Sequence, residues 1–155
     1  MMRNWRGQHK QAERGAALVE FALVVTLLLT LVLGIIEFGL IAMDKLTITQ
    51  AAREGSRAAS LGKTVSEIET RVKGAAEALD TSRLHTEMDY STDNGSTYPF
   101  VLGDVAGENN APNGSLIRIT CGYPHHMITG NFFNWWSGVE DGQLMVRTGV
   151  VMRRE

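Results

Sequence analysis

The stretch ERGAALVEFALVVTLLLTLVLGIIEFG occupies residues 13–39 and decides how the chain divides. The apolar segment that starts within it, residues 16–43, contains 22 hydrophobic residues out of 28. Its uncharged run, residues 21–36, is bracketed by Glu20 and Glu37. In a helix these two carboxylates stand about 26 Å apart, slightly less than the ~30 Å thickness of a bilayer's hydrocarbon core. The pattern therefore predicts a transmembrane helix over 16–43 with a glutamate near each membrane surface.

A short basic segment precedes the apolar one. Residues 1–15 carry four basic side chains and one acidic side chain, so the rest of the chain has a net charge of -5 although the whole chain has -2. Positive residues beside a membrane span tend to stay in the cytoplasm. We therefore expect a cytoplasmic N-terminus and an exported domain over residues 44–155. The basic residues form no stripe on that domain, so no nucleic-acid partner is expected.

Three stretches resemble a known family. RGAALVEF, residues 14–21, is similar to the processing site of type IV pilin-like precursors. Residues 13–39, followed by QAAREGSRAAS at 50–60, resemble TadE-like minor pilins (pseudopilins) of the tight-adherence, Flp-type pilus. The closing VRTGVVMRRE, residues 146–155, resembles the C-terminal strand of that family. Major pilins of this system usually have tyrosine where this chain has Phe21, and they are much shorter, so the resemblance favours a minor component.

The resemblance implies a processing step and an assembly role. A prepilin peptidase would cut between Gly15 and Ala16, which removes residues 1–15 as a leader and makes Glu20 the fifth mature residue. An ionised side chain within an apolar helix usually has a partner. Glu20 would neutralise the α-amine of a neighbouring copy and so set the register between stacked helices.

The same resemblance implies partners and a location. The partners would be the prepilin peptidase, major and minor pilins that contact the N-terminal helix, the inner-membrane assembly platform and the lipid bilayer. The chain would be a single-pass protein of the bacterial inner membrane with a periplasmic C-terminal domain, or it would enter the extracellular pilus. Its expected task is assembly or priming of a pilus for surface adhesion.

A second hypothesis needs no cleavage. A basic leader followed by an apolar helix is also typical of an uncleaved signal anchor. The chain would then be a single-pass anchored scaffold of a secretion or envelope complex, and Glu20 would be a charge at the helix end.

The helix is expected to continue beyond the membrane, over residues 44–61. Ala51, Gly55 and Ala59 recur every four residues and therefore share one face. Small residues at this spacing allow another element to approach closely. Two partners are open: the protein's own sheet or a neighbouring subunit.

A second helix is predicted over residues 64–80. Gly62 is a plausible stop for the first helix. Thr64 and Glu67 then stand at the spacing of a capping box.

The strand and loop region is expected over residues 84–153. Strands are predicted at 84–90, 116–123 and 143–153, where apolar residues alternate with polar ones, and a long loop is predicted at 103–114. The predicted fold is α+β and pilin-like: a long N-terminal transmembrane helix, a second helix and a small antiparallel sheet.

Other candidate sites are weaker. Cys121 is the sole cysteine, which leaves a buried thiol or an intermolecular bridge, and we favour the buried thiol. His125 and His126 lie beside it, but no complete zinc ligand set is evident. No catalytic or nucleotide-binding motif occurs. We therefore expect no metal, no cofactor and no enzymatic activity.

An aromatic segment, NFFNWW at residues 131–136, lies between glycines and is predicted to be a loop. Trp135 and Trp136 either complete a small core or form an exposed contact with another pilin or a surface, because aromatic residues are favoured at interfaces.

Overall fold

The computed structural model describes residues 5–130 and 138–155, with side chains described from Arg14 onward. The chain divides into two units, residues 1–38 and 39–155, and each is described by itself. The first unit is helical throughout its described part, and the second combines two helices with two sheets. The α+β class predicted from the sequence is thus confirmed.

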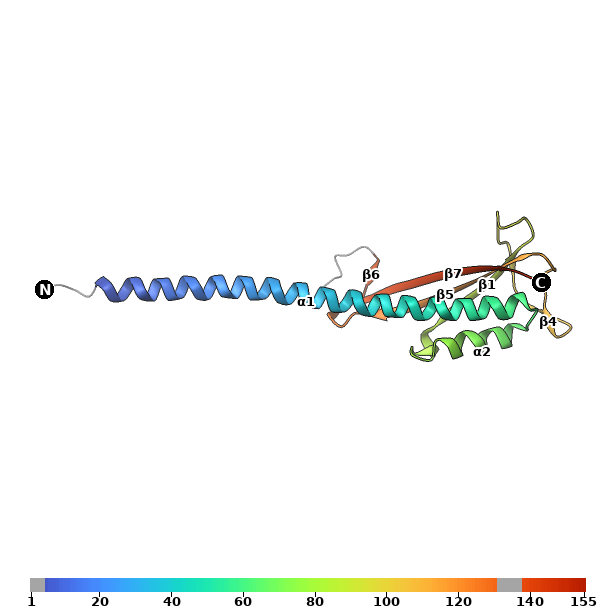
Figure 1. The fold of residues 1–155 in the computed structure, drawn as a ribbon, viewed down its shortest axis with the longest axis horizontal. Coiled ribbons are helices and arrows are strands. Elements are labelled where there is room, and N and C mark those ends of the chain that lie inside the picture. Colours follow the sequence, from blue (N-terminus) through green and yellow to red (C-terminus); the bar gives the residue numbers. More distant parts are fainter. Residues whose placement is uncertain (1–4, 131–137) are drawn as a thin grey trace. The chain divides into compact units, whose positions relative to one another are not determined.

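Helix α1 spans Trp5–Ser60 (Figure 1). It ends at Ser60, one residue before the predicted boundary. Gly62 follows with φ of +78°, a left-handed conformation that glycine adopts without a steric penalty. The amide of Gly62 donates to the carbonyl of Ala59 at 3.0 Å, and that of Lys63 donates to Ala58 at 3.2 Å. The predicted glycine stop is therefore present.

Helix α2 spans Val65–Ala75 and begins with the predicted capping box. The Glu67 amide donates to Thr64 Oγ1 at 3.3 Å, and the Thr64 amide donates to Glu67 Oε2 at 3.1 Å. The predicted C-terminal end at Asp80 is wrong. Asp80 instead caps a separate 3-10 turn, η1 (Thr81–Arg83), because its carboxylate accepts from the Ser82 amide at 3.1 Å.

The main sheet has five antiparallel strands in the order β2-β1-β5-β7-β6. Its centre consists of β1 (His85–Ser91), β5 (Leu116–His126) and β7 (Gln143–Arg153), which lie side by side in Figure 1. The register places Met88, Ile119 and Val150 in one row. The alternation read from the sequence therefore selects the inner face correctly, although β5 is three residues longer than predicted and β1 is shifted by one.

Four short strands were not predicted. β2 (Phe100–Val101) and β6 (Val139–Glu140) extend the main sheet at its two edges. β3 (Asp104–Val105) and β4 (Glu108–Asn109) form a separate hairpin within the predicted loop. Ala106 and Gly107 close this hairpin with φ of +52° and +88°. The loop prediction missed it because Ala106 gives no turn signal.

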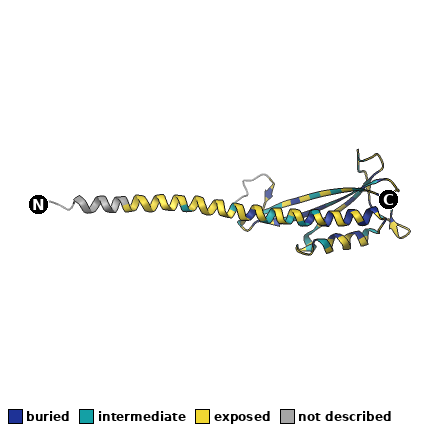
Figure 2. Cartoon of the chain, viewed as in Figure 1, coloured by how far each residue is buried: buried dark blue, intermediate teal, exposed yellow. Residues whose placement is uncertain are grey.

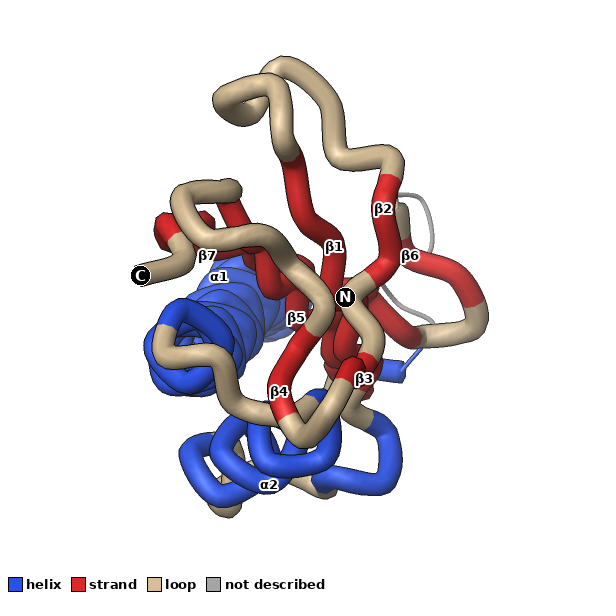
Figure 3. The backbone as a smooth tube through the Cα atoms, turned by 90° about the vertical axis from the view of Figure 1, so that its right-hand side faces the viewer, coloured by secondary structure: helices blue, strands red, loops and turns tan. Residues whose placement is uncertain are grey.

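The core of the second unit lies between the sheet and the two helices, which cover the same face of the sheet (Figure 3). Ile48, Ile68, Ile117 and Ile119 are fully buried there. In Figure 2 the part of α1 that belongs to the second unit has one buried face, and its opposite face is exposed.

Candidate functional site

The predicted processing site lies within α1. Arg14, Gly15 and Ala16 are all helical and exposed. No atom lies within 4 Å of the position that a Cβ on Gly15 would take. Packing therefore does not require glycine at this position. Because glycine disfavours a helix by about 1 kcal/mol relative to alanine, its presence here needs another explanation.

Glu20 is exposed one turn after Ala16, at the start of a run of exposed apolar side chains. Figure 2 shows residues 14–36 as almost entirely exposed. Large apolar side chains in the run include Leu18, Phe21, Leu27 and Ile35, with 64–72% of their surface exposed. A window of 18 residues in this helix has a mean hydropathy of 2.7 and is 0% buried. The helix is a candidate membrane span, consistent with membrane anchoring.

The hydroxyl groups of this segment have partners within the helix. Thr26 Oγ1 donates to the Ala22 carbonyl at 2.7 Å, and Thr30 Oγ1 donates to the Thr26 carbonyl at 2.9 Å. In an apolar surrounding every polar group must be satisfied internally. These two threonines meet that condition. Glu20 differs from them, because it is an exposed ionisable side chain among exposed apolar residues.

The small-residue face of α1 is covered by the protein itself. Ala51 and Ala59 are fully buried, and Gly55 is also buried. A Cβ on Gly55 would lie 2.5 Å from Val72 Cγ2 in α2 and 3.5 Å from Ile119 Cγ2 in β5. Of the two partners left open by the sequence, the structure shows the protein's own sheet and second helix.

Cys121 is free, fully buried and on the inner face of β5. Burial raises the pKa of its thiol to about 11, against a smaller opposing effect of a hydrogen bond with Thr86. This thiol is the buried alternative expected from the sequence.

The two adjacent histidines differ in their surroundings. His125 is buried and its Nδ1 lies 2.7 Å from Asp44 Oδ2 on α1, whereas His126 is exposed. Within the described residues, no group of three His, Cys, Asp or Glu side chains is arranged to hold a metal. Sequence reasoning missed Asp44 as a partner because 81 residues separate it from His125.

A second long-range cluster joins the C-terminal residues to the end of α1. Arg154 is buried and donates to the Asn109 carbonyl at 2.7 Å, to the Asn109 side chain and to Glu108 Oε2 at 2.8 Å. Asn109 Nδ2 donates in turn to the carbonyls of Ala59 at 2.9 Å and Lys63 at 3.0 Å. Asn109 thus supplies partners for carbonyl groups at the end of α1. Sequence reasoning did not find this cluster.

Trp135 and Trp136 lie outside the described residues, so their proposed interface role stays a prediction.

Comparison with known proteins gives one match, in the first part of the chain. No curated protein and no solved structure matches the chain. A family model described as TadE-like protein matches residues 15–57. The match begins at Gly15 and includes Ala51 and Gly55 of the buried small-residue face. It confirms the resemblance over residues 15–57 and supports a TadE-like protein associated with the Tad (Flp-type) pilus system. The resemblance at residues 146–155 stays a prediction.

Proposed function

We propose that the chain is a minor pilin, or pseudopilin, of a tight-adherence pilus machine. A prepilin peptidase would cut after Gly15, and the mature protein would take part in assembly or priming of the pilus for surface adhesion. The observation that carries this proposal is the exposed apolar helix with Glu20 near its start, in the segment where the TadE-like family matches.

Exposure of the apolar side chains of this helix to water is energetically unfavourable. Burial of each large apolar side chain is worth about 1.5–3 kcal/mol, and many such side chains lie exposed between residues 17 and 36. A bilayer would cover them before assembly, and the helices of other pilins would cover them afterwards. The same surface would therefore serve first as an anchor and then as a contact between subunits.

Glu20 would give this otherwise non-directional surface a register. A free α-amine on Ala16 carries a positive charge at neutral pH. A carboxylate in an apolar bundle is tolerated when an opposite charge neutralises it. Pairing between Glu20 and the amine of a neighbouring subunit would thus favour one axial position over the others.

The proposed role is structural and not catalytic. The second unit would lie in the periplasm or on the filament, with the N-terminus in the cytoplasm before cleavage. The assembly platform of the inner membrane and the other pilins would be its partners.

The proposal is tested by Glu20→Ala, introduced in the native host in place of the wild-type copy. The variant should still be inserted and cleaved, because residues 14–16 are unchanged, but surface pili should be lost or strongly reduced. Pili are counted by electron microscopy, and processing is followed by the mass of the membrane protein. Glu69→Ala is the matched control, since Glu69 is an exposed glutamate on α2 outside the proposed assembly surface. Normal piliation with Glu20→Ala would refute the register role.

A further inference from the structure

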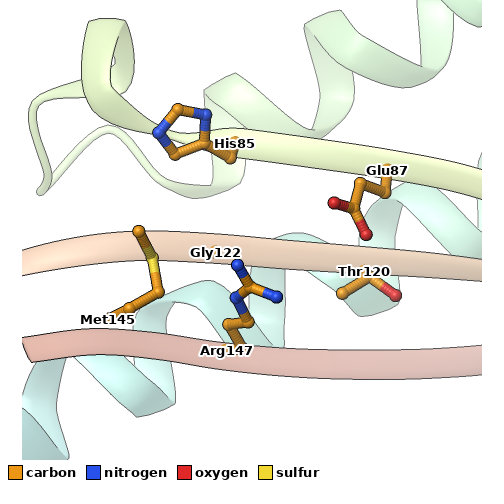
Figure 4. A pocket seen from close by; sticks show the side chains of 6 residues that line it. All are labelled: His85, Glu87, Thr120, Gly122, Met145 and Arg147. Atoms are coloured by element: carbon orange, nitrogen blue, oxygen red, sulfur yellow. The ribbon is translucent and has the colours of Figure 1, made fainter. Parts of the chain in front are cut away.

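The outer face of the main sheet, turned away from the helices, contains a hollow of about 290 Å³. Three adjacent strands supply its lining, and the close-up in Figure 4 shows these side chains around the central strand. The lining residues are His85 and Glu87 from β1, Thr120 and Gly122 from β5, and Met145 and Arg147 from β7.

Gly122 lies at the floor of the hollow and is buried beneath neighbouring side chains. Gly122 pairs with Arg147, and Gly149 pairs with Thr120 one step along the same face. Neither glycine has the left-handed φ that would require it. A Cβ on Gly122 would make ordinary contacts, with its nearest neighbours at 3.6 Å, and one on Gly149 would lie 3.5 Å from Thr120 Oγ1.

These two glycines are therefore needed neither for backbone conformation nor for packing. Glycine within a strand weakens the strand, and it often marks a place where a ligand or another backbone approaches closely. Gly149 is exposed and fits such an approach, whereas the side chains of Arg147, Met145 and His85 cover Gly122.

Arg147 is the charged group that this approach would meet. The comparable outward-facing Arg118 is occupied: it pairs with Asp89 at 3.0 Å and lies 4.1 Å from the centre of the Tyr98 ring. Among the described residues, no ion pair or hydrogen bond engages the Arg147 guanidinium. Figure 4 shows it directed toward Gly122. A guanidinium group is well suited to hold a carboxylate through two parallel hydrogen bonds.

Glu87 restricts what kind of carboxylate would fit. It extends from β1 toward β5, on the other side of the hollow from the strand that carries Arg147 (Figure 4). An isolated carboxylate would gain from Arg147 but would be repelled by Glu87. A ligand that carries hydroxyl groups beside its carboxylate would donate hydrogen bonds to Glu87 and exchange them with Thr120 and His85.

We propose that this hollow binds a carboxylated monosaccharide of the uronic acid class. Arg147 would hold the carboxylate, and Glu87 would accept hydrogen bonds from the sugar hydroxyls. The volume lies near the lower end of the ~300–1,000 Å³ of small-molecule sites, which suits one sugar unit. This binding is independent of pilin processing.

The test uses the full-length protein in nanodiscs, with its methionine methyl groups labelled with ¹³C for NMR. Galacturonate is titrated and compared with galactose, the sugar that lacks the carboxylate. The methyl signal of Met145, a wall of the hollow, should shift and saturate with galacturonate and not with galactose. Met88 on the inner face is the internal reference.

Three variants locate the binding. Arg147→Gln should weaken the affinity at least about tenfold, because it removes a charge-assisted hydrogen-bond pair. Glu87→Ala should also weaken the binding of galacturonate, because the sugar hydroxyls lose their acceptor. Arg153→Gln is the matched control, because it removes an equal charge from the same face of β7 but lies outside the hollow.

Several results would overturn the proposal. One is the absence of a Met145 shift, and another is an equal shift with galactose. An equal loss of affinity in Arg147→Gln and Arg153→Gln would show that binding depends on the overall charge of this face and not on Arg147. Equal binding of N-acetyl-glutamate amide would show a site for any carboxylate and would contradict the sugar assignment.

Discussion

Gly55 has the least room for a Cβ of all the described glycines. Its missing Cβ lets α1 approach α2 and β5, and a Cβ there would meet Val72 Cγ2 at 2.5 Å. Val72 is β-branched and fully buried, so it cannot move away cheaply. The glycine therefore weakens the helix locally but allows the two helices and the sheet to share one core.

Gly55→Ala is expected to lower the free energy of unfolding by about 1–2 kcal/mol. Overpacking of a core costs about 1–3 kcal/mol, and the better helix propensity of alanine returns up to about 1 kcal/mol. Urea unfolding of the full-length protein in detergent micelles measures the change. Gly74→Ala is the matched control: nothing lies within 4 Å of its Cβ position, so it should stabilise α2 by about 0.5–1 kcal/mol. Equal effects of the two substitutions would contradict the packing role of Gly55.

Cys121 gives a prediction about pH. Its pKa is raised from 9.0 to about 11 by burial, so the folded state disfavours the thiolate relative to the unfolded state. The contribution to stability is therefore fully present below pH 9 and is lost as the pH rises through about 11. Cys121→Ala should remove this part of the alkaline loss of stability, measured as urea midpoints from pH 8 to 11. An unchanged pH profile in the variant would show that Cys121 does not contribute to it.

At the scale of elements, α2 is the helix whose start is most clearly predicted by its local sequence. Thr64 and Glu67 cap each other as their spacing predicts. Thr64→Ala should destabilise the second unit by about 0.5–2 kcal/mol, because it removes the acceptor for the Glu67 amide. Thr70→Ala is the control, since Thr70 is exposed in mid-helix and its hydroxyl donates only to the Ser66 carbonyl. Urea unfolding should show a lower midpoint for Thr64→Ala alone, and equal midpoints would argue against the cap.

The β3–β4 hairpin depends on contacts from the other end of the chain. Arg154→Ala should cost about 1.5–3 kcal/mol, because hydrogen bonds that involve a charged group are the stronger ones. The amide of Asn109, which donates to the Gly62 carbonyl at 3.1 Å, should also exchange with solvent faster. Arg153→Ala is the neighbouring control, since Arg153 is exposed and bonds only to Asn94 Oδ1 at 3.1 Å. Unchanged exchange at Asn109 in Arg154→Ala would refute the proposed link.

Elements with local signals could be predicted from the sequence, and elements with long-range causes could not. The apolar run, the capping box at Thr64 and the alternation in β5 and β7 all act within a few residues. The end of α2 was misplaced because Asp80 caps a new turn instead of closing the helix. The hairpin at 104–109 and the pair of Asp44 with His125 depend on contacts between distant residues, which no spacing in the sequence reveals.

The candidate functional site divides in the same way. Gly15 and Glu20 form a local pattern, so the sequence could indicate them, and both lie within the segment that the family model matches. The partner of Ala51, Gly55 and Ala59 could not be chosen from the sequence, since a small-residue face fits its own sheet as well as another subunit. Only the folded second unit shows which surface covers them.

At the scale of the whole molecule, the two units have opposite requirements. The second unit buries its apolar residues in a core of its own, whereas the described residues of the first unit leave a long series of them exposed. The second unit can therefore be expected to fold in water, and the first requires a bilayer or other helices. In the proposed minor-pilin role, the helix would leave a bilayer only into an assembly that covers its apolar side chains again.

Cleavage is the step on which the proposed minor-pilin role depends most directly. The intact mass and N-terminal sequence of the protein from native membranes measure it. We predict a mature chain that begins at Ala16 and contains 140 residues, with a side-chain charge of -5. A chain that begins at Met1 and retains residues 1–15 would contradict the minor-pilin proposal. It would favour an uncleaved anchored scaffold.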